Sequence, residues 1–258
     1  MPPLPVIRHF AELGESTAAL AALVDGAEPD LPVPSCPGWT LRQLATHVGR
    51  AHRWAAEIVR TRSADFIEFR SVPDGRLPDD PGARGPWLTS GASRLTDAVR
   101  EADQDRVWAF GELRPASFWA RRMAHETLVH GADAALACGR QPVLTAEFAS
   151  DAIDEWLAMA SGRSGGEPDP RSDALPDGRS LHVHVTDRDL DGTGEWLVRR
   201  ADGGLEVSAG HAKADVALTG PAADVLLVLL RRLPATHHGV TVHGDADLLA
   251  RWLERTSF

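Results

Sequence analysis

The spacing of apolar residues changes once along this chain, and the change divides the sequence into two domains. Up to about Ala160, apolar residues recur every three or four positions, as on amphipathic helices. A stretch rich in glycine, serine, proline and aspartate follows, and behind it apolar and polar residues alternate, as on half-buried strands. We therefore expect an α+β two-domain protein, with a helical bundle at residues 1–162, a linker at 163–178 and a small mixed α/β domain at 179–258.

The first domain has the pattern of a four- or five-helix bundle. The expected helices span residues 6–23, 40–60, 87–102, 116–137 and 146–160. The hydroxyl of Thr40 is expected to cap the second helix by accepting from a free amide of its first turn. The run SVPDGRLPDDPGARGP precedes the third helix, and its prolines and glycines predict an irregular loop or lid.

The second domain has short strands separated by turn signals such as DG, GG and TG. The expected strands span residues 181–185, 195–200, 205–208, 216–219 and 239–243. An apolar helix is expected from Pro221 to Arg232, and a last helix from Ala246 to about Arg255.

Charge and composition limit the partners of this chain. Its 258 residues carry a formal net charge of −10, so we expect no nucleic-acid binding, which requires a cationic surface. No segment approaches the roughly 20 apolar residues of a membrane span, and we expect neither export nor contact with a membrane. The two cysteines, Cys36 and Cys138, make no disulfide framework, so we interpret them as free thiols of a cytoplasmic protein.

The strongest candidate site lies on the expected helix at 116–137. Glu126 and His130 fall on an otherwise apolar stripe of this helix, where an ionised carboxylate needs a partner. Their spacing of four residues places the carboxylate and the imidazole side by side. Two interpretations stay open here: the pair binds one metal cation, or the two side chains bond each other and stabilise the bundle.

Several other histidines are candidate metal ligands. The segment HETLVH is not a zincin motif, which requires histidines four positions apart, so we expect His125 at a partner-facing or surface position. On the second expected helix, periodicity favours His52 over His47 as a third ligand, because His52 lies on the apolar stripe. In the second domain, His182 and His184 share a strand face, but two ligands without a third are weak evidence, and we expect surface histidines there.

Four segments carry a resemblance to a known family. The run VPSCPGWTLRQLATHVG, followed much later by ARRMAHETLVHGADA, resembles the N-terminal domain of the mycothiol-dependent maleylpyruvate isomerase family, a relative of the DinB-like metal-binding bundles. The segments ADVALTGPAADVLLVLLRRLP and VTVHGDADLLARWL resemble the smaller C-terminal domain of that family. The resemblance implies that His47, Glu126 and His130 bind a divalent metal, zinc above all, although such a set also accepts nickel or iron.

The resemblance also implies an activity and a thiol cofactor. A mycothiol thiolate, stabilised by the metal, would add to the double bond of a small unsaturated acid, allow rotation and leave, which makes the chain an isomerase. The alternatives are a mycothiol S-transferase acting on an electrophile and a non-catalytic metal- or small-molecule-binding protein. The resemblance also places an arginine that holds the thiol or substrate at the end of the apolar helix before a Leu-Pro, which matches Arg232 best and Arg231 next; a solvated helix end is the alternative role. Cys36 is expected near the site without acting as the nucleophile.

Overall fold

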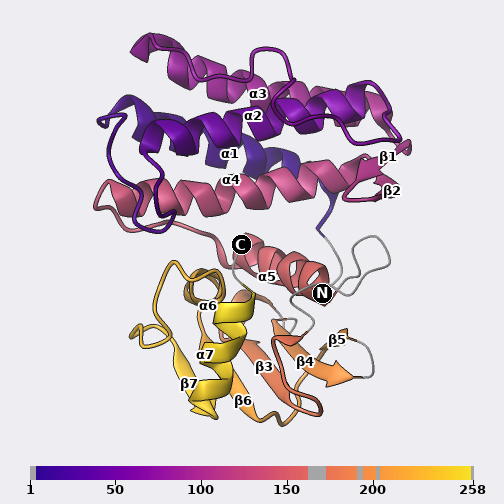
Figure 1. The fold of residues 1–258 in the computed structure, drawn as a ribbon, viewed down its shortest axis with the longest axis vertical. Coiled ribbons are helices and arrows are strands. Elements are labelled where there is room, and N and C mark those ends of the chain that lie inside the picture. Colours follow the sequence, from indigo (N-terminus) through magenta and orange to yellow (C-terminus); the bar gives the residue numbers. More distant parts are fainter. Residues whose placement is uncertain (1–3, 162–172, 191–193, 202–203, 257–258) are drawn as a thin grey trace. The chain divides into compact units, whose positions relative to one another are not determined.

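A computed structural model describes residues 4–161, 173–190, 194–201 and 204–256 (Figure 1). They form two compact units, one of Leu4–Val143 and one that begins at Leu144. The first is helical and the second contains a mixed sheet, which confirms the α+β two-domain architecture expected from the sequence. Among the described residues, no helix is long and apolar enough to cross a membrane.

Four long helices make up the first unit. Both α1 and α2 pack against α3 and α4, so that the four helices enclose one bundle core. Their bounds are α1 Val6–Asp25, α2 Leu41–Arg60, α3 Pro81–Ala102 and α4 Ser117–Ala137. A short antiparallel hairpin, β1 (Arg106–Ala109) and β2 (Glu112–Pro115), connects α3 to α4 and was not expected from the sequence.

The start of α2 follows the sequence prediction closely. The Thr40 hydroxyl accepts a hydrogen bond from the backbone N–H of Gln43, and the Gln43 side chain accepts one from the backbone N–H of Thr40. This capping box satisfies two amides that would otherwise lack a partner in the helix. It fixes the position at which α2 begins, six residues before His47.

The helix α3 begins earlier than expected. The segment before Trp87 was predicted to be irregular, but Asp80 caps a helix that starts at Pro81. A proline is tolerated in the first turn, because its missing N–H would have no partner in the helix there. The second proline, Pro86, lies inside the helix, so the prediction of a loop was wrong for residues 81–86.

The second unit holds a five-stranded sheet in the order β5-β4-β3-β6-β7. The central strand β3 runs parallel to β6 and antiparallel to β4. On one face of the sheet, Val183 of β3 and its register partner Leu218 of β6 are fully buried. The elements are α5 Ala146–Ser161, β3 Ser180–Val185, the 3-10 turn η2 Arg188–Leu190, β4 Glu195–Ala201, β5 Gly204–Ala209, β6 Val216–Gly220, α6 Ala222–Leu229, β7 Thr241–Gly244 and α7 Ala246–Arg255.

The boundary between the units differs from the one expected at residue 162. The helix α5 packs against α6 and β5, and the Trp196 indole donates to Oδ1 of Asp154 on α5 at 3.0 Å. Helical periodicity identified α5 as a helix, but periodicity does not say which core a helix faces. Residues 163–172 of the expected linker at 163–178 lie outside the described residues. Behind them, Ala174 and Leu175 are buried.

Candidate metal centre

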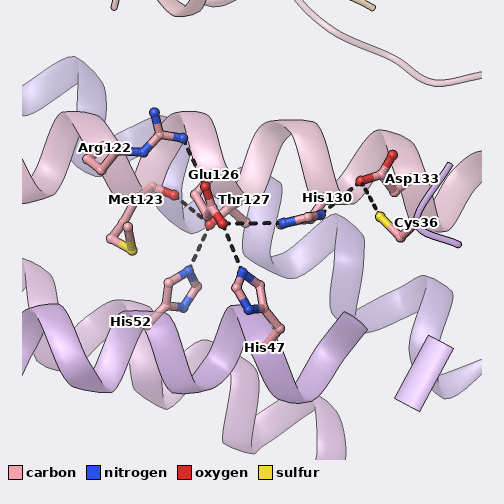
Figure 2. A network of polar contacts seen from close by, with 9 residues as sticks. All are labelled: Cys36, His47, His52, Arg122, Met123, Glu126, Thr127, His130 and Asp133. Carbon is pink, nitrogen blue, oxygen red and sulfur yellow. Dashed lines mark hydrogen bonds and ion pairs between the residues drawn. The ribbon is translucent and has the colours of Figure 1, made fainter. Parts of the chain in front are cut away.

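Three side chains expected to form a metal site meet between α2 and α4. The Nε2 atom of His47 lies 2.9 Å from Oε1 of Glu126, and Nε2 of His130 lies 3.3 Å from the same oxygen. Figure 2 shows both imidazoles directed at the Glu126 carboxylate. One donor atom of each residue lies within 4.8 Å of the other two. The structure thus brings the three residues together, and metal binding by them stays a prediction.

Aromatic rings hold the two imidazoles from the side. The ring of Trp39 lies 5.1 Å from that of His47 and 6.3 Å from that of His130, measured between centroids, and is stacked on the latter. The ring of Phe69 lies 5.9 Å from His47. These contacts restrict the rotation of both imidazoles. They also explain what the tryptophan of the Pro-Gly-Trp segment, Trp39, does eight residues before His47.

Both oxygens of the Glu126 carboxylate contact other side chains. A guanidinium nitrogen of Arg122, one turn earlier on α4, lies 2.9 Å from Oε2, while Oε1 faces the imidazoles. Burial raises the pKa of the Glu126 carboxyl, but hydrogen bonds from His130 and His47, with the charges of His130 and Arg122, outweigh burial and hold this pKa well below its usual range. Glu126 is therefore an anion at neutral pH. The structure shows the contact between Glu126 and His130 that the sequence left open, and it adds Arg122 as a further partner of Glu126.

Asp133 extends the network on the far side of His130. Its Oδ2 lies 2.8 Å from Nδ1 of His130 and accepts a hydrogen bond from the Cys36 thiol at 3.3 Å. Burial lowers the pKa of His130, but hydrogen bonds with Asp133, Cys36 and Glu126 raise it well above its usual value. Asp133 was not predicted as part of the site, although its position three residues after His130 on the same helix was an available signal. The expectation that Cys36 lies near the site agrees with this geometry.

The histidine that periodicity favoured has another role. His52 is fully buried, and its Nε2 lies 2.7 Å from the Thr127 hydroxyl, which donates to the Met123 carbonyl (Figure 2). Burial and the charge of Arg53 lower the pKa of His52 to about 3, so this ring is neutral at physiological pH. The contact between His52 and Thr127 therefore joins α2 to α4 in their buried interface, five residues after His47 along α2.

Of the two positions expected for His125, facing a partner or at the surface, the surface position was wrong. This side chain is buried, and its ring lies 5.9 Å from that of His9 on α1. The helix α4 packs against α1, α2 and α3 at once, so more than one of its faces is covered. A single apolar stripe therefore underestimates how much of this helix is buried.

The donor set suits a borderline divalent cation. Two imidazole nitrogens and one carboxylate oxygen, supplied by facing helices, are the ligands of catalytic zinc and related sites. Asp133 occupies the second nitrogen of His130, which is how carboxylates commonly orient a metal-binding histidine. The side chains of His47 and Glu126 are 28% and 24% exposed, so solvent and small molecules reach the site. The residues present therefore fit a divalent metal that keeps a coordination position open to solvent.

Arg232 lies in the second unit, just beyond the end of α6. This helix ends at Leu229, three residues earlier than expected, and a guanidinium nitrogen of Arg232 donates to the Leu230 carbonyl at 2.7 Å. Such a contact with a carbonyl at the end of a helix is typical of the alternative role expected for Arg232, that of a helix-end arginine. Binding of a thiol by Arg232 stays a prediction.

The fold and the site define a two-domain protein: one domain is a four-helix bundle that carries a His/Glu/His constellation, and the other contains a small mixed sheet. Residues 10–135 match the family model of the mycothiol maleylpyruvate isomerase N-terminal domain, and residues 147–251 match the model of the C-terminal domain of the same family. The chain therefore belongs to the mycothiol-dependent maleylpyruvate isomerase family.

Solved structures agree with this assignment at the level of the fold. The crystal structure of the mycothiol-dependent maleylpyruvate isomerase is similar over 95% of this chain and 97% of its own, with a TM-score of 0.60 and 16% sequence identity. A histidine-to-alanine mutant of that enzyme gives the same TM-score, at 15% identity. No curated protein matches the sequence.

Proposed function

We propose that this chain is a metal- and mycothiol-dependent isomerase of the maleylpyruvate type. The observation that carries the proposal is the convergence of His47, Glu126 and His130 on one point between α2 and α4. Membership of the isomerase family supports mycothiol as the thiol and a small unsaturated acid as the substrate.

His47, Glu126 and His130 would hold the metal, most suitably zinc. When bound, a divalent cation there would stabilise the thiolate form of mycothiol, whose free thiol would otherwise be mostly protonated at neutral pH. Rotation about a substrate double bond requires that bond to become single for a time, and reversible addition of a thiol provides this. The chain itself must then place the two reactants and keep the ligand side chains in position.

The surrounding side chains perform that second task. Arg122 holds one oxygen of Glu126 and leaves the other directed at the imidazoles. Asp133 holds Nδ1 of His130, so that its Nε2 faces Glu126. Trp39 restrains both rings. The ligand geometry is therefore set before any metal binds, which lowers the entropic cost of binding.

We place this activity in the cytoplasm. Cys36 and Cys138 are both free thiols, as expected of a protein in a reducing compartment, which is also where a low-molecular-weight thiol stays reduced. Fractionation of the native cells, followed by detection of the protein in the soluble or the membrane and exported fractions, tests this placement.

Product analysis tests the proposed reaction. Full-length protein loaded with zinc is incubated with maleylpyruvate and mycothiol, and the products are followed by NMR. We expect the trans isomer to form only when mycothiol is present, and to fall to background in the His47→Ala protein. His238→Ala, a change of an exposed histidine in the second unit, is the matched control and should retain activity. A stable mycothiol adduct would show a transferase instead, and the absence of turnover would show a binding protein.

A further inference from the structure

A second group of metal-ligating side chains lies on the sheet of the second unit. The Oε2 atom of Glu195 on β4 lies 3.0 Å from Nε2 of His182 on β3 and 2.7 Å from Nδ1 of His211, which follows β5. The Nε2 atom of His184 lies 3.7 Å from the other Glu195 oxygen. Three imidazoles thus surround one carboxylate.

The sheet register explains why these residues meet. His182 and His184 are two residues apart on β3, so their side chains leave the same face of the sheet. Glu195 is the register partner of His184 on the antiparallel neighbour β4. The chain then turns at Gly210, whose φ of 121° glycine adopts readily, and its N–H donates to the Glu195 carbonyl. This turn places His211 next to Glu195, a juxtaposition that the spacing of residues along the sequence does not reveal.

The group of histidines around Glu195 is buried on one side and open to solvent on the other. The His182 side chain is 6% exposed and that of His211 is 75% exposed. An ion reaching the site from solvent would meet His211 first.

We propose that His182, Glu195 and His211 bind a second divalent transition-metal ion, with His184 within reach as a fourth ligand. One donor atom of each of the first three residues lies within 4.8 Å of the other two, so small side-chain rotations would bring all of them to about 2.0–2.2 Å from one zinc ion. Imidazole and carboxylate ligands favour zinc, nickel or copper over magnesium or calcium. This site shares no ligand with the one between α2 and α4.

Zinc titration of a full-length His47→Ala protein isolates this site from the first. After removal of metal by a chelator, we expect isothermal titration calorimetry to show one equivalent of zinc bound, and the melting temperature to rise with zinc. Adding His211→Ala should weaken binding at least about tenfold, the loss typical when a metal loses part of its coordination environment. Because the His211 side chain is largely exposed, its removal leaves the fold intact, which circular dichroism checks.

Two further variants complete the test. Glu195→Gln in the His47→Ala background should also weaken zinc binding, whereas His238→Ala, the matched exposed histidine, should leave it unchanged. Failure of the His47→Ala protein to bind zinc saturably would overturn the proposal. So would zinc binding that both His211→Ala and Glu195→Gln leave unaltered. Neither result depends on turnover, so the proposed isomerase function stands or falls separately.

Discussion

The Oδ2 atom of Asp133 lies 2.8 Å from Nδ1 of His130. This contact leaves Nε2 of His130 as the nitrogen that faces Glu126, and thereby determines which nitrogen is available to a metal. Asp133 itself is fully buried and lies three residues further along the same helix, so this orienting contact forms within α4, and Trp39 restrains the same ring from outside the helix.

Replacing Asp133 by asparagine should weaken metal binding without removing a ligand. The amide keeps the size of the side chain but loses the charge that orients the His130 ring, and such losses lower metal affinity about 10- to 100-fold. Competition with a chromogenic zinc chelator measures the change. Asp97→Asn, at an exposed carboxylate on α3, is the control and should keep the original affinity. Equal affinities for the two variants would show that Asp133 does not position His130.

Replacing Cys36 by serine should leave the reaction dependent on mycothiol. The serine hydroxyl can still donate to Asp133, and the nucleophile in our account is the added thiol. Initial rates with and without mycothiol, for the original and the Cys36→Ser protein, provide the measurement. Loss of turnover in the variant, together with turnover of the original protein without mycothiol, would identify Cys36 as the nucleophile.

Replacing Arg232 by lysine separates its two roles. Lysine keeps the positive charge beyond the end of α6 but loses the forked geometry of a guanidinium. If Arg232 anchors the ligand, the KM for mycothiol rises while the metal content stays the same. Unchanged kinetics would leave Arg232 with only the contact to the Leu230 carbonyl and would remove it from the site.

Replacing Gly49 by alanine should destabilise the bundle. A Cβ atom at Gly49 would lie 2.0 Å from the Trp87 ring, so α2 and α3 could not keep their close approach. Overpacking of this kind costs about 1–3 kcal/mol of the free energy of unfolding. Gly14→Ala on α1, where an added Cβ atom would meet no atom within 4 Å apart from the local backbone of its own helix, is the control and should stabilise the protein by up to about 1 kcal/mol. Urea unfolding measures both, and similar stabilities of the two variants would contradict the close packing.

The sequence predicted much of this fold because its signals are local. The cap at Thr40 and the alternation along β3 depend on neighbouring residues and were predicted correctly. Periodicity also identified the polar pair on α4. It could not select His47, because periodicity marks the most buried position, which is His52, whereas a ligand must face an opening. The choice of His47 came from the resemblance.

The features that were missed depend on contacts between distant residues. Glu195 joins His182 only through strand register, and His211 joins them only through the turn at Gly210. Likewise, α5 was recognised as a helix, but its place beside β5 and α6 depends on the tertiary packing of those elements. Spacing along one chain segment contains no information of this kind.

Cobalt spectroscopy tests the central claim that mycothiol sulfur binds a metal held by His47, Glu126 and His130. The Cys36→Ser/His211→Ala protein is loaded with Co²⁺ in place of zinc and titrated with mycothiol. The first change excludes that protein thiol as the source of the signal, and the second weakens the other proposed metal site. We predict a thiolate-to-cobalt charge-transfer band in the near ultraviolet that grows to saturation, and that is lost when Glu126→Gln is added. Bound cobalt whose spectrum does not change at saturating mycothiol, or a band that persists in the Glu126→Gln protein, would contradict this account.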